Sequence, residues 1–279
     1  MTHLRQTAVQ VPRSSHNRNY EIPPVPTAAE REVADLLAID ADPEAAAVLD
    51  SVPFWFHTFA IGVNGKRNYT HGMARDHRYR LPALPADFSG LSVLDIGTFD
   101  GFYAFLAEAR GADRVLAVDN EQYRDWISSR WGAELEGGEG FAAIAGLLDS
   151  EVDYRTLDAF DLDEVDEQFD LVLCFGILHR VENPLGLMKI LARRTAEGGR
   201  VLLETHGSAD KDLDAARAVH VPDPGGTYSN DDFVFWGFTP GGLDALARHA
   251  GFAGFELLDA PTLDGHPRLI GALLTAEPV

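Results

Sequence analysis

Short apolar runs alternate along residues 91–274 with segments in which apolar residues recur at helical spacing. An apolar run of this kind predicts a strand that is buried on both faces of a sheet. The alternation predicts an α/β fold with a Rossmann-like, doubly wound sheet, because strands joined by helices pair in parallel. The seven predicted strands are residues 93–96, 114–118, 152–156, 169–175, 200–204, 255–258 and 269–274, of which the last two form a closing antiparallel hairpin.

The first 88 residues have a different pattern. Residues 1–26 contain prolines among polar side chains and predict a flexible tail. A helix is predicted to begin after Thr27, because Thr27 and Glu30 have the spacing of a capping box. An aromatic cluster follows at residues 54–59. We therefore expect an N-terminal helical and aromatic cap over residues 27–88 and a main domain over residues 89–279.

The turn after the first predicted strand of the main domain has the features of a ligand site. Gly97 allows the backbone to approach a ligand closely, and Gly101 lets the next helix pack against the strand. Asp119 ends the second strand, 22 residues after Gly97. A nucleotide-binding βαβ unit places a carboxylate on the ribose hydroxyls at this offset.

Asp95 indicates which ligand this turn binds. A carboxylate suits the cationic amino-acid end of S-adenosylmethionine, whereas it repels a pyrophosphate. The spacing from Gly97 to Gly101 also differs from the dinucleotide pattern G-x-G-x-x-G. The turn therefore predicts S-adenosylmethionine as the cofactor. An NAD-dependent oxidoreductase and a non-catalytic nucleotide-binding protein are the alternatives.

The remaining cofactor contacts are expected at the same edge of the sheet, where open α/β sheets bind ligands. Asp158, after the third strand, can accept a hydrogen bond from the adenine amine. Phe160 or its neighbour Ala159 can cover the adenine ring. The predicted cofactor site is completed by Thr98 and Phe99 in the first turn, Asn120 after the second strand and Phe175 at the end of the fourth.

Three histidines are candidates for a catalytic base. His179 follows the central fourth strand, His206 ends the fifth, and His57 belongs to the aromatic cluster of the cap. Histidine titrates near neutrality and can take a proton from an acceptor. The alternative for each is a histidine that only hydrogen-bonds the substrate or packs in the core. A base is not obligatory, because positioning the acceptor in line with an electrophilic methyl group contributes most.

Four further residues are predicted to contact the acceptor. Residues 208–238 have an irregular composition and several aromatics, which predicts a lid over a pocket. Tyr228 and Trp236 belong to this lid, and Trp55 belongs to the cap. Arg180 can pair with an acidic acceptor or, structurally, with Glu204.

Composition restricts the partners. The chain has 44 acidic and 23 basic side chains and a formal charge of -21, which repels nucleic acid. The basic cluster at residues 67–80 is explained equally well by a solvated or cofactor-facing loop. A single cysteine, Cys174, fits a reducing cytoplasm, and no apolar run predicts a membrane span or signal peptide. No residue spacing predicts a metal site.

The turn resembles the first motif of class I S-adenosylmethionine-dependent methyltransferases, Asp-x-Gly-x-Gly-x-Gly. Over residues 53–258 the chain also resembles relatives of the bacterial enzyme that makes carboxymethoxy-uridine at the tRNA wobble position. This resemblance implies the fold and the cofactor, whereas family members act on either tRNA or small molecules. It is carried by Trp-x-His at 55–57, Val-Leu-Asp-Ile-Gly at 93–97, Phe-Asp-Leu-Val at 169–172, Gly-Ile-Leu at 176–178, Asn-Pro-Leu at 183–185, Leu-Glu-Thr at 203–205, Thr-Pro at 239–240 and Gly-Phe at 251–252.

Two departures from the family pattern bear on function. Phe99 stands where the first motif has its middle glycine, and His179-Arg180 follows Gly-Ile-Leu where the family has Tyr-His. The resemblance implies that this tyrosine helps hold a carboxylated form of the cofactor in the tRNA enzyme. Its replacement, together with the negative charge, favours ordinary S-adenosylmethionine and in-line transfer of its methyl group to an O, N or C atom of a small molecule, as in secondary metabolism. A tRNA-modifying enzyme is the alternative.

Overall fold

The computed structural model describes residues 25–74, 77–120, 124, 127–128, 134–208, 216–227, 233–263 and 265–275. The predicted tail, apart from residues 25–26, lies outside these ranges. Among the described residues, no helix is both long and apolar enough to cross a membrane.

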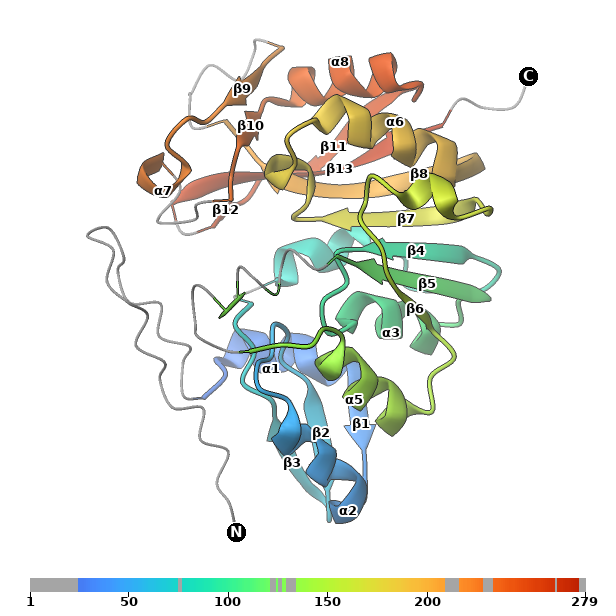
Figure 1. Cartoon of the computed structure of the whole chain (residues 1–279), viewed down its shortest axis with the longest axis vertical. Coiled ribbons are helices and arrows are strands. Elements are labelled where there is room, and N and C mark those ends of the chain that lie inside the picture. The colour runs from blue at the N-terminus through green and yellow to red at the C-terminus, as the bar shows by residue number, and fades with distance from the viewer. Residues whose placement is uncertain are drawn as a thin grey trace.

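The main sheet has the strand order β11-β13-β8-β7-β4-β5-β6 (Figure 1). Strands β6, β5, β4, β7 and β8 are parallel to one another, and β13 runs antiparallel to its neighbours β8 and β11, as predicted. A further strand, β12 (Thr262–Leu263), pairs with β13. The strands are β4 (Ser92–Ile96), β5 (Arg114–Asp119), β6 (Asp153–Thr156), β7 (Phe169–Phe175), β8 (Thr195–His206), β11 (Gly254–Asp259) and β13 (His266–Leu274).

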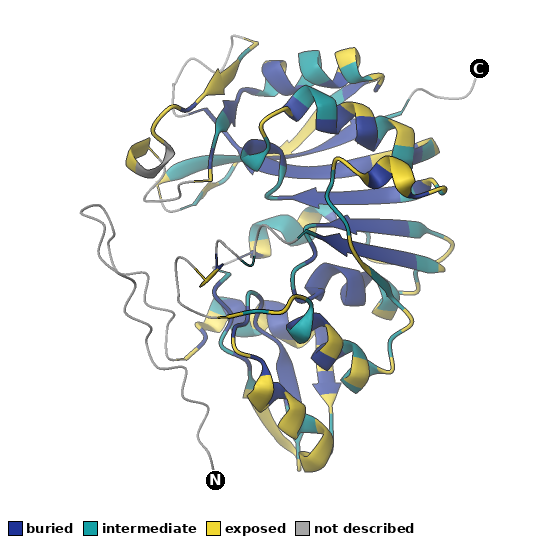
Figure 2. Ribbon diagram, in the orientation of Figure 1, coloured by how far each residue is buried: buried dark blue, intermediate teal, exposed yellow. Residues whose placement is uncertain are grey.

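Helices cover both faces of this sheet (Figures 1 and 2). α3 (Phe102–Ala109) and α5 (Glu139–Leu148) bury aromatic and aliphatic side chains on the face that also carries the cap. α6 (Pro184–Arg194) and α8 (Pro240–Ala250) cover the other face. The direction of the chain's winding changes between β4 and β7, which are neighbours. The carboxyl ends of these strands therefore flank the position where open α/β sheets bind ligands.

The helix α6 ends before the glycine pair at 198–199. Asn183 caps it by accepting a hydrogen bond from the amide of Gly186. The helix stops at Arg194, and β8 begins at Thr195 rather than at residue 200. Gly199 lies within the strand, where a Cβ atom would be 2.9 Å from the carbonyl oxygen of Asp170. The glycine therefore serves close strand packing and does not end a helix.

The cap is not purely helical, which corrects the prediction. Its capping box at Thr27 and Glu30 is present, and α1 (Ala28–Ala34) follows it. The cap also contains a small sheet of order β1-β2-β3. Asn64 and Gly65 turn between the second and third strands with φ angles of 51° and 73°, the left-handed values that an Asn-Gly hairpin turn uses.

The other cap elements are short. They are listed here in chain order: η1 (Asp35–Leu37), β1 (Ala38–Asp40), α2 (Pro43–Ala46), η2 (Ala47–Ser51), β2 (Ala60–Val63), β3 (Lys66–Tyr69) and η3 (Arg78–Ala83). Strands of three or four residues carry too little periodicity to be read from a sequence, and they are stabilised here by pairing with one another.

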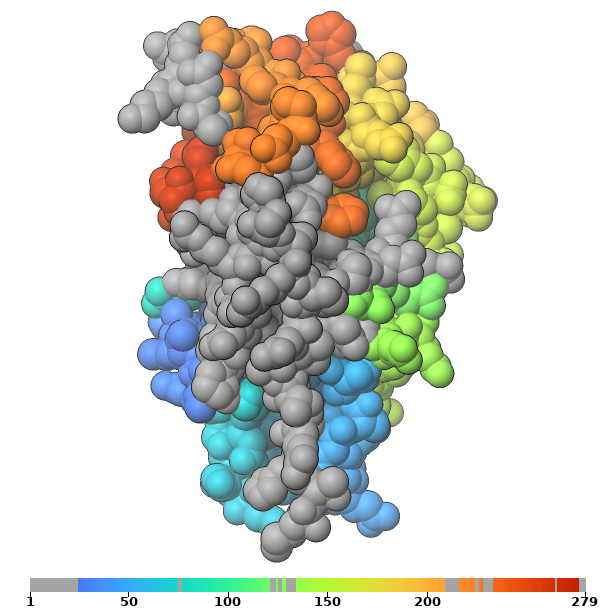
Figure 3. Space-filling view, turned by 60° about the vertical axis from the view of Figure 1, so that its left-hand side comes forward, coloured from blue at the N-terminus to red at the C-terminus, as the bar shows by residue number. Residues whose placement is uncertain are grey.

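The predicted lid is described only in part. β9 (Ala218–His220) pairs antiparallel with β10 (Trp236–Phe238), and α7 (Pro224–Thr227) lies between them in the chain. These elements lie at the opposite end of the molecule from the cap strands (Figure 3). Tyr228 lies outside the described residues. The described part of the chain also contains two short 3-10 helices, η4 (Leu162–Glu164) and η5 (Leu178–Arg180).

Candidate active site

The loop after β4 is fastened to the end of β5 by a carboxylate. Asp119 accepts hydrogen bonds from the amides of Phe99 (2.7 Å) and Asn120 (2.9 Å). Asp95, in β4, accepts one from the hydroxyl of Thr98 (2.7 Å). The structure thus brings together the acid, the loop and the second acid that the sequence analysis assigned to cofactor binding.

Left-handed backbone makes this loop possible. Gly97, Phe99 and Gly101 have φ angles of 73°, 57° and 86°. A Cβ atom on Gly97 would lie 2.4 Å from Ile177, and one on Gly101 would lie 2.5 Å from Phe105. The two glycines are therefore required both by conformation and by space, whereas Phe99 adopts a left-handed conformation despite its side chain.

Three carboxylates are buried at this loop: Asp95, Asp100 and Asp119. Burial raises the pKa of Asp95 to about 6, against the opposing hydrogen bond from Thr98. Burial likewise raises the pKa of Asp119 to about 7, and the charges of Asp95 and Asp100 add to the shift. A site with this much buried negative charge is stabilised by a cation and destabilised by a phosphate.

Asp158 continues the row of carboxylates at the end of β6. It accepts hydrogen bonds from the side-chain amide of Asn120 (2.8 Å) and from the amide of Phe160 (2.8 Å). Ala159 packs against the core. The side chain of Phe160 is 37% exposed. Contact of Asp158, Ala159 and Phe160 with an adenine stays a prediction from the sequence.

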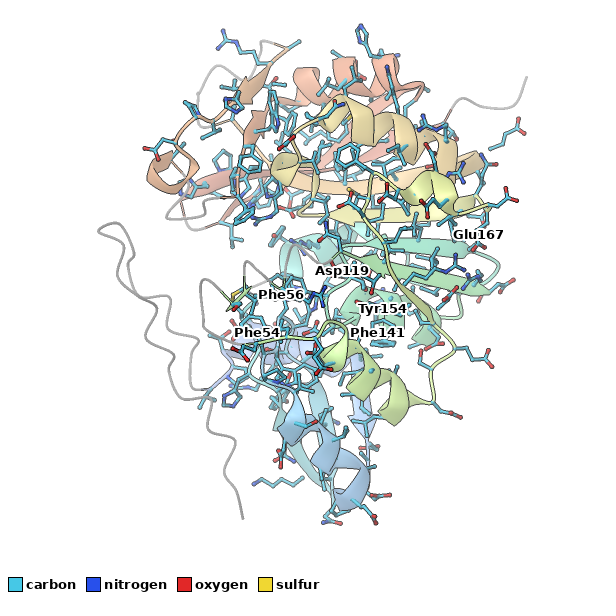
Figure 4. All side chains as sticks on the ribbon, viewed as in Figure 1. Phe54, Phe56, Asp119, Phe141, Tyr154 and Glu167 are labelled. Carbon is cyan, nitrogen blue, oxygen red and sulfur yellow. The ribbon has the colours of Figure 1, made fainter. Side chains whose placement is uncertain are left out.

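The cap reaches this loop through its aromatic cluster. The ring of Phe56 stacks on Phe99 at 4.3 Å between centroids with an interplanar angle of 16°. Figure 4 shows Asp119 at the end of β5, with Phe56 of the cap to its lower left. Asp100 accepts hydrogen bonds from the amides of Phe56 and His57 and from Nδ1 of His57. Trp55 is buried in the core between the cap and the main sheet, close to Phe59.

A buried ion cluster lies beside the ends of β7 and β8. Nη2 of Arg80 donates to Glu204 at 2.8 Å, and Nη1 of Arg268 lies 3.6 Å from the other oxygen of Glu204. Burial lowers the pKa of Arg80, but Tyr79 and Glu204 raise it by more, so that it lies well above the usual value. Glu204 is fully buried.

Arg180 does not take the structural role considered for it. Its Nε donates to the carbonyl oxygen of Gly176 at 3.0 Å. Glu204 pairs with Arg80 and Arg268 instead, because both guanidiniums lie on the sheet face onto which Glu204 projects. The prediction of an Arg180–Glu204 ion pair is therefore wrong. Phe175 contacts the same cluster, since its ring centroid is 5.5 Å from the guanidinium carbon of Arg80.

The histidines fall into two groups. His179 and His206 are buried with their ring centroids 4.4 Å apart. Burial, followed by the charges of His206 and of nearby arginines, lowers the pKa of His179 well below its usual value. His57 lies apart from this pair, among the rings of Phe56, His77, Phe102 and Tyr103.

Trp236 is placed by β10. Its indole Nε1 donates to the carbonyl oxygen of Val181 at 3.0 Å, and its ring lies 5.4 Å from that of His220. This contact connects the described part of the lid with the segment that follows His179 and Arg180. No cluster of metal-ligating side chains occurs among the residues that the structure describes.

Two candidate functional residues, Asp100 and Arg80, are not predicted by the sequence. Asp100 stands inside the cofactor loop, but nothing in its spacing indicates a partner in the cap. From the sequence, Arg80 is only one member of the basic cluster at residues 67–80. The one feature of the sequence that points to Asp100 is its negative charge within a turn that is predicted to lie close to a ligand.

A family model described as "Methyltransferase domain" matches residues 67–257. The chain belongs to this family. The match confirms the predicted class, a class I S-adenosylmethionine-dependent methyltransferase, together with its methyl donor.

Solved structures agree on the fold. The N-terminal domain of EvdMO1, with S-adenosylhomocysteine bound, has a TM-score of 0.58 and 20% identity, and the match covers 84% of this chain and 96% of that one. The YcgJ protein of Bacillus subtilis has a TM-score of 0.53 and 14% identity, with 72% and 100% coverage. At these identities the likeness concerns the fold alone.

Curated relatives differ in their substrates. The tRNA U34 carboxymethyltransferase of Campylobacter concisus is 23% identical over 67% of this chain and 58% of its own length. The ubiquinone biosynthesis O-methyltransferase of Pseudomonas syringae pv. tomato is 29% identical over 60% of this chain and 66% of its own length. The chain thus spans less than two thirds of these relatives.

Proposed function

We propose that this methyltransferase transfers the methyl group of S-adenosylmethionine to an O, N or C atom of a small-molecule acceptor, as in secondary metabolism. The observation that carries the proposal is the cluster of three buried carboxylates, Asp95, Asp100 and Asp119, at the loop after β4. Buried carboxylates are costly unless a cation accompanies them. The amino group and sulfonium of the cofactor are such cations, whereas the pyrophosphate of NAD is repelled.

Different residues of the chain are proposed to bind different parts of the cofactor. In this proposal Asp119 accepts from the ribose hydroxyls and Asp158 from the adenine amine, while Ala159 and Phe160 flank the ring. The backbone at Gly97 and Thr98 lies against the remainder of the cofactor. When bound, the sulfonium supplies an electrophilic methyl group. Holding the acceptor in line with that group contributes about 7–11 kcal/mol to catalysis.

The acceptor is proposed to be small and polar. Nε of Arg80 and Nε of Arg268 are buried without a hydrogen-bond partner among the described residues. Buried donors of this kind are satisfied in native proteins, so a ligand with oxygen acceptors fits beside them. Among the described residues both guanidiniums pair with the same carboxylate, Glu204, and an acceptor with an acidic group suits such a pair of arginines.

Titration calorimetry with S-adenosylmethionine, S-adenosylhomocysteine and NAD tests the cofactor assignment. Binding of the first two without NAD is expected, and binding of NAD alone would contradict the proposal. The acceptor is then sought by measuring S-adenosylhomocysteine formation with a panel of phenols, catechols, hydroxybenzoates and primary amines. Cofactor binding without turnover on any small acceptor would favour a non-catalytic protein.

A tRNA substrate is the second candidate, favoured by the tRNA U34 carboxymethyltransferases among the relatives. The formal charge of -21 opposes it, because RNA binding requires release of counterions by basic side chains. A gel-shift titration with bulk tRNA at low ionic strength is expected to give no complex. A complex that weakens steeply with added salt would favour the tRNA reaction instead.

A further inference from the structure

The side chain of Asp100 connects the cofactor loop to the cap. Its Oδ2 accepts hydrogen bonds from the amides of Phe56 (2.8 Å) and His57 (2.9 Å), and its Oδ1 contacts Nδ1 of His57. The partners are 43 and 44 positions apart in the chain. Asp100 and His57 are each 3% exposed. Such a set of contacts fixes the imidazole of His57 relative to the loop that binds the cofactor.

This geometry decides which nitrogen of His57 holds the proton. A carboxylate can only accept, so Nδ1 must be the protonated nitrogen of the neutral ring. Nε2 then has a free lone pair. It is buried and has no hydrogen-bond partner within the described part of the chain. An imidazole arranged in this way is prepared to accept a proton on Nε2, and the carboxylate stabilises the cation that results.

The surroundings of His57 contain other titratable groups. The pKa of the neighbouring His77 is lowered well below its usual value, first by burial and then by His57 itself, so His77 stays neutral. Nδ1 of His77 is 2.9 Å from the hydroxyl of Tyr103, whose pKa burial raises. The groups that face His57 or interact with its charge are Asp100 from the loop, Asp95 from β4, His77 before η3 and Tyr103 in α3. The charge of Arg80, in η3, acts on two of these groups, His77 and Asp95.

The other two histidines have less suitable surroundings. Protonation of His179 is opposed by burial and by the charges of Arg180, Arg268 and Arg80. Its Nδ1 contacts the hydroxyl of Thr205 at 3.2 Å, and the amide of His206 lies 3.4 Å from it. The carboxylate of Glu204 nearby is engaged by arginines. His57 therefore has the carboxylate partner that a proton-accepting imidazole needs, and His179 lies among cations instead.

We infer that His57 accepts the proton of the acceptor during methyl transfer and that Asp100 is its positioning residue. The inference rests on the proposed function. As the acceptor atom bonds to the methyl carbon, the carbon–sulfur bond breaks and its electron pair remains on sulfur. The proton of the acceptor moves to Nε2 of His57 and leaves for solvent after the product has departed. Asp100 keeps its own charge throughout and balances the imidazolium.

The substitution Asp100→Asn separates positioning from structure. An asparagine oxygen can still accept from the amides of Phe56 and His57, so the cap stays attached. Its NH₂ group cannot accept from Nδ1, which forces the proton of His57 onto Nε2. Asp113→Asn is the matched control, because Asp113 also accepts a backbone hydrogen bond, from Gly90 at 3.1 Å, in an exposed loop. His57→Gln removes the proposed base itself.

Two readouts test the inference. The first is ¹⁵N NMR of histidine-labelled full-length protein without ligands, in which the ring signal lost in His57→Gln identifies His57. Protonated Nδ1 and unprotonated Nε2 are expected in the wild type and Asp113→Asn, with the reverse in Asp100→Asn. An unchanged tautomer in Asp100→Asn would overturn the positioning role. This measurement does not depend on methyl transfer, so it can fail while the proposed function stands.

The second readout is the rate of S-adenosylhomocysteine formation against pH, with the acceptor found in the panel. His57→Gln is expected to lower kcat by about 10²–10⁴-fold and to remove the rise of rate on the acid side, with S-adenosylmethionine affinity retained. Asp100→Asn should lower kcat in the same direction and Asp113→Asn should not. Wild-type kcat in His57→Gln would overturn the inference even if Asp100→Asn did not fold. Absence of cofactor binding in the wild type would instead refute the proposed function.

Discussion

The amide of Phe99 donates to Asp119 at 2.7 Å and joins the loop after β4 to the end of β5. The amide of Asn120 occupies the other oxygen of the same carboxylate at 2.9 Å. Both contacts favour the ionised form, yet burial dominates and raises the pKa of Asp119 to about 7. One carboxylate thus shapes the cofactor loop and remains close to its own titration at neutral pH.

Asp119→Asn should weaken binding of S-adenosylhomocysteine by about 10–100-fold, the effect of losing a hydrogen bond to a charged group. Ribose hydroxyls donate best to the ionised carboxylate. The wild-type affinity is therefore expected to rise as pH increases from 6 to 8 through the pKa of Asp119, which is about 7. Calorimetric titrations across this range test both points. Equal pH dependence in Asp119→Asn and the wild type would assign the effect to another group.

Asp95 should make the ligand-free protein less stable as pH rises. Burial raises its pKa from 3.8 to about 6 in the folded state, so the folded state holds its proton more tightly than the unfolded state. The contribution of Asp95 to the free energy of unfolding is fully present below pH 4 and is lost as the pH rises through about 6. Asp95→Asn is therefore expected to exceed the wild type in unfolding free energy by about 1–3 kcal/mol at pH 8 and to match it at pH 4. Urea denaturation at both pH values measures this difference, with Asp113→Asn as the control.

Gly101→Ala should cost more stability than Gly90→Ala. Both glycines have left-handed backbone, with φ of 86° and 79°, so alanine is strained at either position. A Cβ on Gly101 would lie 2.5 Å from Phe105, whereas one on Gly90 would have open space. We expect a loss of about 1 kcal/mol for Gly90→Ala and about 2–4 kcal/mol for Gly101→Ala. Equal losses in urea denaturation would show that Phe105 moves aside freely.

Glu204→Gln should be strongly destabilising, because it leaves the buried guanidiniums of Arg80 and Arg268 without their carboxylate. Removal of one partner of a buried ion pair costs about 3–5 kcal/mol. The matched control is Glu167→Gln, whose partner Arg114 is 3.0 Å away in a pair that is about one-third exposed. That change should cost less than about 1 kcal/mol. Similar denaturant midpoints for the two variants would contradict the buried role of Glu204.

Local pattern was sufficient for much of the fold. The apolar run Phe169–Phe175 coincides with β7, and Asn183 caps α6 through its side chain. The predicted antiparallel pairing of the last two strands of the main sheet is also confirmed. The loop that is predicted to bind the cofactor was recognisable because two glycines and the carboxylate at the end of the next strand lie within one short βαβ unit.

Other features could not be read from local pattern. The helix preceding β8 ends at Arg194, since strand pairing with β7 begins at Thr195 and overrides the glycine pair. The small sheet of the cap consists of strands that form only because they pair with one another. The sequence suggests Arg180 as an ion partner of Glu204, because Arg180 is near in the chain, whereas the structure pairs Glu204 with the distant Arg80.

The sequence by itself determined the class of fold, the positions of most strands of the main sheet and the loop that is predicted to hold the cofactor, because each depends on residues close together in the chain. Only the tertiary structure decided that Asp100 meets His57 and that Arg80 meets Glu204, which are 43 and 124 positions apart. Hydrogen bonds and ion pairs act over a few ångströms. Packing of the cap on the sheet decides which distant side chains come within that range.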